Sequence, residues 1–95
     1  MKAYELLNDK SKWCQGANAR NARQRGVAST SPAAVKWGLL GAFARCYGLD
    51  RPADYIQQWA RLRTAVGEAT SITAWNDDPA RTYAEVVGLL KRLDI

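Results

Sequence analysis

Two cysteines and nine carboxylates are the side chains of this chain best suited to covalent or acid–base chemistry. Cys14 is the candidate nucleophile, because Cys46 lies in an apolar run typical of a buried helix. A cysteine nucleophile needs a base, usually His, and the chain contains no His. The cations Lys12 and Arg20 would lower the pKa of Cys14, but a structural thiol is the simpler interpretation.

Three carboxylates, Asp77, Asp78 and Glu85, lie close together in the sequence. Such a group could do acid–base work or hold a divalent ion, but their spacing is more typical of helix capping. No zinc-binding spacing and no GxxxxGK phosphate loop occurs. We therefore expect no catalytic residue, no metal site and no cofactor, and the sequence predicts that the protein is not an enzyme.

The basic segment, residues 10–36, contains six cations and no acid, whereas the other eight cations are outnumbered by nine acids. The six cations are Lys10, Lys12, Arg20, Arg23, Arg25 and Lys36. Arginines interleaved with Asn and Gln can contact phosphates and base edges. The alternatives are a solvated loop without a partner, or a loop docked on the protein's own acids.

One tryptophan, Trp13, lies in this segment, and another, Trp37, follows it directly. Trp13 could stack on a base, and an exposed Trp beside cations is typical of a protein-binding hot spot. Core packing is the alternative for both Trp13 and Trp37, and we favour it. The candidate binding residues are Lys12, Trp13, Arg20, Arg23, Arg25 and Trp37.

The scaffold for these residues is predicted to be mainly α, a single domain of about four helices around a central helix at 32–47. Ninety-five residues, 47% of them hydrophobic, suffice for one core. Ser31 and Pro32 resemble an N-cap and first helical position, and Gly48 a helix end. Its predicted apolar face comprises Val35, Leu39, Ala42, Phe43 and Cys46.

A second side of this helix is smooth, with Ala34, Gly38, Gly41 and Arg45. Two glycines inside a helix cost about 1 kcal/mol each relative to Ala, so we expect another backbone to lie close to them. The 13–30 segment or a second subunit would fit, and the oligomeric state stays open.

Three further helices are expected. The first spans 2–12; another starts at Arg51-Pro52, ends at Gly67 and buries a stripe of Tyr55, Trp59, Leu62 and Val66. The last follows a capping box formed by Thr82 and Glu85. Ile72 and Trp75 should reach the core from a single turn in the connector. Residues 13–30 show no helical stripe and should be irregular or hairpin-like, anchored by Trp13 and Val27.

The start of the sequence lacks the pattern of a signal peptide, and the central apolar run carries Lys36 and Arg45. These features predict no membrane span, and two cysteines are too few for a disulfide framework. We expect a cytoplasmic protein.

Several stretches together resemble a family of small uncharacterised bacterial and bacteriophage proteins. They are Trp13-Cys-Gln-Gly-Ala17, Ala19-Arg-Asn-Ala22, Gly26-Val27, Ala34-Val-Lys-Trp-Gly-Leu-Leu-Gly-Ala42, Ile72-Thr-Ala-Trp-Asn-Asp77 and Arg81-Thr-Tyr-Ala-Glu-Val-Val87. The chain departs from the family pattern at Asn21, where Asp is usual, and at Gly38, where Cys is usual. The resemblance implies a small accessory protein, in some cases carried by mobile elements.

These observations predict non-catalytic binding of a larger protein or protein–nucleic-acid complex through residues 13–30. For a phage-like accessory protein, inhibition of a host defence system is one such role. Direct nucleic-acid binding through the basic segment is the first alternative, and a structural homo-oligomer is the second.

Overall fold

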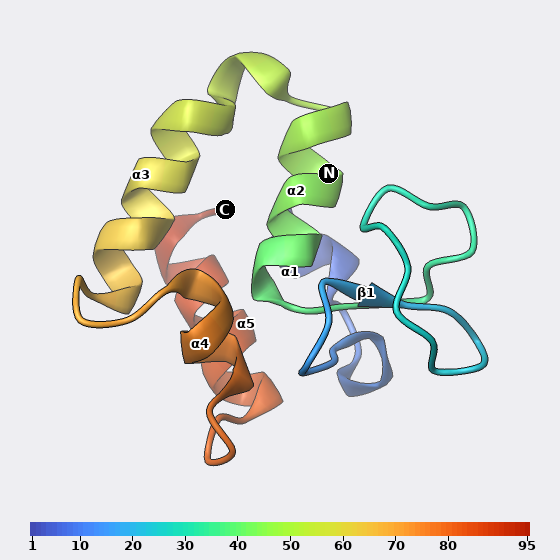
Figure 1. The fold of residues 1–95 in the computed structure, drawn as a ribbon. Coiled ribbons are helices and arrows are strands. Elements are labelled where there is room, and N and C mark those ends of the chain that lie inside the picture. The colour runs from blue at the N-terminus through green and yellow to red at the C-terminus, as the bar shows by residue number, and fades with distance from the viewer.

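The computed structural model describes all 95 residues and confirms a mainly α, small single domain (Figure 1). Its elements are α1 (Ala3–Leu6), the 3₁₀ turn η1 (Lys10–Lys12), β1 (Ala19–Arg20), β2 (Lys36–Trp37), α2 (Leu39–Leu49), the 3₁₀ turn η2 (Pro52–Asp54), α3 (Tyr55–Val66), α4 (Ile72–Asp77) and α5 (Tyr83–Leu93). The helices gather on one side of the molecule, and the loops around β1 extend from the other.

Residues 13–37 form a small cluster of extended segments joined by loops, in agreement with the irregular or hairpin-like structure predicted for 13–30. β1 pairs antiparallel with β2, so that Ala19 lies opposite Trp37. Single bridges add Gly26 beside Arg20 and Trp13 beside Trp37. Trp13 and Val27, both in this cluster of extended segments, pack against the core as predicted.

The predicted start of the central helix at residue 32 is wrong, because α2 begins at Leu39, and its predicted end is two residues short, because α2 continues through Gly48 to Leu49. The Ser31 hydroxyl does accept a hydrogen bond from the N–H of Ala33, 3.1 Å away, but this turn does not continue into a helix. Instead Val35 donates its N–H to the carbonyl of Arg20 at 2.9 Å. Hydrogen-bond partners in the neighbouring extended segments thus replace those that a helix would have supplied to this backbone.

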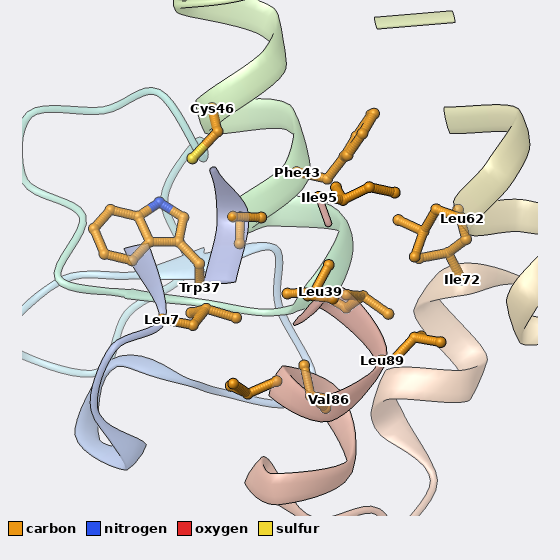
Figure 2. Packing of buried hydrophobic residues seen from close by; sticks show 14 of the residues in the cluster. Leu7, Trp37, Leu39, Phe43, Cys46, Leu62, Ile72, Val86, Leu89 and Ile95 are labelled. Atoms are coloured by element: carbon orange, nitrogen blue, oxygen red, sulfur yellow. The ribbon is translucent and has the colours of Figure 1, made fainter. Parts of the chain in front are cut away.

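The core surrounds α2, whose Leu39, Ala42, Phe43, Cys46 and Tyr47 side chains are buried. Figure 2 shows side chains from both ends of the chain and from α2, α3, α4 and α5 meeting in this cluster. The Phe43 and Tyr47 rings stack with centroids 4.7 Å apart. Val35 was expected on this face, but it precedes the helix and is 45% exposed.

The first and third predicted helices need smaller corrections. Instead of one helix over 2–12, α1 stops at Leu6 and η1 forms a separate turn. The break coincides with Asn8-Asp9, and Asp9 accepts a hydrogen bond from the Ser11 hydroxyl, a local bond that competes with the helix. In α3, Leu62 and Val66 are buried as predicted, but Trp59 is 39% exposed.

The C-terminal part follows the sequence signals closely. Thr82 and Glu85 form the predicted capping box at the start of α5. The expected single turn around Ile72 and Trp75 is the short helix α4, capped by the Ser71 hydroxyl, which accepts the N–H of Ala74. Ile72 is buried and Trp75 is half-buried.

Candidate functional site

The tip of the basic segment is a tight turn organised by Asn21. Its side-chain oxygen accepts hydrogen bonds from the backbone N–H groups of Arg23 (2.9 Å) and Arg25 (3.1 Å). Its own N–H donates to the carbonyl of Arg25 at 2.9 Å, and Gln24 adopts a positive φ of 64°. Asn favours such turns because its short amide bonds to nearby backbone. The turn therefore has a defined shape.

The side chain of Arg20 stabilises this turn through two hydrogen bonds. Its guanidinium donates to the carbonyl of Gln24 at 2.8 Å and to the carbonyl of Gln15 at 3.1 Å. The side chain is half-buried. Of the three arginines predicted to contact a partner, Arg20 is thus occupied by the protein's own backbone.

Arg23 and Arg25, in contrast, are exposed. None of the six cations of the basic segment forms an ion pair with a carboxylate of the protein. The four ion pairs of the molecule are Met1 amino group–Asp50, Lys2–Asp94, Arg45–Asp50 and Arg81–Glu85. The cations of this loop are therefore not paired with the protein's own acids, unlike in one of the alternatives above.

The two candidate tryptophans are held inside the structure. Trp37 is 8% exposed, and its indole N–H donates to the carbonyl of Ser29 at 2.9 Å. Trp13 is half-buried, and its indole N–H donates to the side-chain oxygen of Asn76 at 2.7 Å. Lys12, in η1, is half-buried. The exposed candidates are therefore arginines rather than aromatic rings.

Asn76 of α4 connects the base of the basic segment to the helices. It is 3% exposed, and its side-chain oxygen also accepts the N–H of Leu39, the first residue of α2, at 3.1 Å. Its side-chain nitrogen donates to the carbonyl of Cys14 at 3.1 Å. One amide therefore fixes α2, α4 and the start of the loop relative to one another.

Neighbouring residues extend this junction. The side chain of Gln15 donates to the carbonyls of Asn76 and Asp78, both at 2.8 Å. The Asp77 carboxylate accepts the N–H of Gly16 at 3.0 Å. The sequence predicted a capping role for Asp77, but it did not predict that Asn76 and Asp77 bind a segment about sixty residues earlier.

Gly38, the N-cap of α2, and Gly41, in its first turn, contact the 13–30 segment directly. A Cβ atom on Gly41 would lie 1.7 Å from the carbonyl oxygen of Asn18, and Gly38 donates its N–H to that same oxygen at 3.1 Å. The expectation of a close backbone at these glycines is confirmed, and the backbone is the chain's own 13–30 segment.

Neither thiol has the surroundings of a nucleophile. Cys14 is 8% exposed, and burial raises its pKa despite the nearby charges of Arg20 and Lys36, contrary to the lowering expected from its cationic neighbours. Burial also raises the pKa of Cys46 to about 11. No three His, Cys, Asp or Glu side chains gather as a metal ion would require.

The most voluminous surface hollow lies away from the basic segment, between α1 and α5. It encloses about 530 Å³, and its lining includes Tyr4, Tyr83 and Val87 with one acid, Glu5, and one cation, Lys91. The Tyr83 hydroxyl is occupied, since it donates to the carbonyl of Leu7 at 2.6 Å. This lining provides no nucleophile–base pair.

None of the helices combines the length and the apolar character that crossing a membrane requires. Comparison with curated proteins finds no match, and comparison with solved structures finds none either. A family described as being of unknown function (DUF6197) matches residues 1–93. The match covers nearly the whole chain, including the Asn76 junction and the basic segment. The chain therefore belongs to this family of unknown function, DUF6197.

Proposed function

We propose that this protein is a non-catalytic binding protein that docks on an acidic surface of a larger protein or protein–nucleic-acid complex. The turn at 21–25 provides the contact surface, with Arg23 and Arg25 as the principal contacts. The observation that carries the proposal is the exposure of these two arginines, without an acidic partner, on a turn of defined shape.

The rigidity of the turn supports binding because it lowers the entropy lost on association. A mobile loop must be ordered when a partner docks, which weakens affinity. Here Asn21 and Arg20 already hold the backbone of the turn. The junction at Asn76 in turn holds the start of the segment. The arginine side chains are the main groups left to be ordered.

A protein surface fits better than a single-stranded nucleic acid. Sequence-independent binding of single strands relies on aromatic rings on which bases stack. Trp37 is buried and Trp13 is half-buried, with its indole N–H bonded to Asn76, so neither ring is fully exposed beside the arginines. Carboxylates of a protein need only the guanidinium groups, which bind them through paired N–H donors. Inhibition of a host defence system is a narrower hypothesis that rests on the family resemblance alone.

The experiment is a pull-down from a bacterial lysate with the wild-type protein and the single variants Arg23→Glu and Arg25→Glu. Lys91→Glu is the matched control, because it reverses an exposed cation on α5, outside the basic segment. We expect the wild-type protein to co-purify with a partner protein, and this binding to persist after nuclease treatment. Either arginine variant should lose the partner, and the control variant should retain it.

Two results would contradict the proposal. Retention of the partner by both arginine variants would exclude the turn as the binding site. Loss of all binding after nuclease treatment, together with a steep decrease of oligonucleotide binding with salt, would replace it with direct nucleic-acid binding.

A further inference from the structure

Gly88 is a helix-interior glycine that the fold of the single chain does not explain. It is exposed in the middle of α5, and a Cβ atom built there would meet nothing within 4 Å. Glycine is a poor helix former compared with Ala. Gly41 is explained by the backbone of Asn18, and Gly67 by its positive φ at the end of α3. Gly48 also has open space around it, but it lies one residue before the end of α2, whereas Gly88 lies at the middle of α5. A similar close approach at Gly88 would have to come from another molecule.

The surface around Gly88 is hollowed. A depression of about 380 Å³ is lined by Trp75, Glu85, Gly88, Leu89 and Arg92. The four α5 residues follow the i, i+3, i+4, i+7 spacing of a single helix face. Trp75 forms the wall from α4, with the guanidinium of Arg81 3.7 Å from its ring centroid. The hollow is therefore an open helix face beside an aromatic side chain.

The two charged residues on this face, Glu85 and Arg92, could pair with the same two residues of a second copy of the chain. Glu85 and Arg92 lie equally far from the midpoint between Gly88 and Leu89. A two-fold axis through that midpoint would place Glu85 opposite Arg92 of a second copy, twice, with Gly88 beside the axis. Leu89, only 5% exposed, belongs to the core of its own chain and forms the floor of the hollow. We propose that the occupant of this face is a second copy of the chain, packed antiparallel along α5. Such a contact is isologous, as in most dimers.

The state of the two charged side chains favours this occupant. The Arg92 side chain is exposed and forms no ion pair with a carboxylate of the chain. Glu85 accepts hydrogen bonds from the Thr82 N–H at 2.9 Å, from the Thr82 hydroxyl at 3.1 Å and from Arg81 at 3.1 Å, and its side chain is 48% exposed. A carboxylate has about four acceptor sites, so one site is left for a single N–H of an arginine. The contact leaves the basic segment free, and it does not depend on the proposed function.

The size of the hollow sets the expected strength. Stable interfaces bury about 800 Å² per partner, whereas this face is a single short helix with one tryptophan beside it. The net charge of +5 on each copy also opposes association. We therefore expect a dimer whose population rises with protein concentration.

Sedimentation equilibrium over a range of concentrations tests the proposal on the full chain. Arg92→Glu places two acids opposite each other and should weaken dimerisation by roughly tenfold or more. Lys91→Glu is the matched control, since it makes the same change in charge one residue away, outside the hollow. Gly88→Leu should abolish the dimer by filling the space, while circular dichroism still shows a folded monomer.

Mixing two variants gives the sharpest readout. Glu85→Lys and Arg92→Glu should each fail to dimerise alone, but an equimolar mixture should form a heterodimer, because both ion pairs are then restored with reversed sign. Should Glu85→Lys fail to fold because its cap is lost, Arg92→Glu and Gly88→Leu decide the matter alone. A wild-type protein that stays monomeric, or a dimer that these two variants leave intact, would overturn the proposal, as would equal loss with Lys91→Glu.

Discussion

The carbonyl oxygen of Asn18 would lie 1.7 Å from a Cβ atom on Gly41, a separation that no real pair of atoms can adopt without bonding. The contact joins the start of the basic segment to the helix at the centre of the core. The neighbouring atoms belong to backbone rather than to a flexible side chain, so they cannot turn aside. The position of the basic segment is therefore tied to the absence of a side chain at one residue.

Gly41→Ala should destabilise the protein by about 3 kcal/mol or more, at or above the upper end of overpacking costs. Gly88→Ala is the matched control, since it sits inside a helix with open space around it and should stabilise the monomer by up to about 1 kcal/mol. Urea unfolding at low protein concentration measures both. Equal stability of Gly41→Ala and wild type would show that the segment does not press on α2.

Asn76→Ala should cost about 3 kcal/mol, because the Trp13 indole N–H, the Leu39 N–H and the Cys14 carbonyl lose a buried partner together. Hydrogen exchange should accelerate most at the Leu39 amide. Asn8→Ala, at an exposed asparagine, is the control and should change stability by less than about 0.5 kcal/mol. Unchanged exchange at Leu39 in the Asn76 variant would contradict the role of this amide.

Arg20 and Arg23 should differ in their effect on folding. Arg20→Ala removes the donor to two loop carbonyls and should cost about 1–2 kcal/mol. Arg23→Ala should change stability by less than about 0.5 kcal/mol, since its side chain is exposed. Thermal unfolding separates the two. If both variants melt like the wild type, the two hydrogen bonds of the Arg20 guanidinium contribute nothing to the stability of the fold.

The capping box gives a pH dependence of known sign. Hydrogen bonds from the backbone N–H and hydroxyl of Thr82, with the charge of Arg81, hold the pKa of Glu85 below its ordinary value of 4.5. The folded pKa is depressed, so this stabilisation is complete above pH 4.5 and is lost as the pH falls through the folded value. Glu85→Gln should therefore lose less stability than wild type between pH 5 and acid conditions, in urea titrations at fixed pH. Parallel curves for the two proteins would refute the assignment.

The two thiols should resist modification in the folded protein. Burial raises the pKa of both, that of Cys46 to about 11, so at neutral pH each is present as the less reactive thiol. We expect slow alkylation of both at pH 7.5, followed by mass spectrometry, and rapid alkylation in denaturant. Fast labelling of Cys14 alone would instead indicate an accessible, activated thiol.

The same shift predicts a decrease in stability at alkaline pH. A raised folded pKa means that stability is fully present below the unfolded value of 9.0 and decreases as the pH rises towards 11. Cys46→Ala should flatten this part of the stability curve, although the lost packing lowers it throughout. A wild-type curve that is flat between pH 9 and 11 would argue against a buried Cys46 thiol.

Local signals in the sequence determined several elements correctly. The capping box at Thr82 and the end of α3 at Gly67 depend on residues within one turn of each other, so short-range chemistry suffices. Gly41 also indicated a close neighbour, because the cost of a glycine inside a helix needs an offset, but nothing near it in the sequence identified that neighbour as Asn18. The capping box and the helix end could be predicted from the sequence because each depends on residues next to it.

The tertiary structure decided where α2 begins. Ser31 and Pro32 are a valid start signal, but residues 35–37 find backbone partners in Arg20 and Cys14, and Asn76 supplies an acceptor to the N–H of Leu39. Those partners lie far away in the sequence, so no local pattern reports them. The same holds for the proposed binding surface: charge marked residues 10–36, but only the fold shows that Arg20 is occupied, that Trp37 is buried and Trp13 half-buried, and that Arg23 and Arg25 are exposed without an acidic partner.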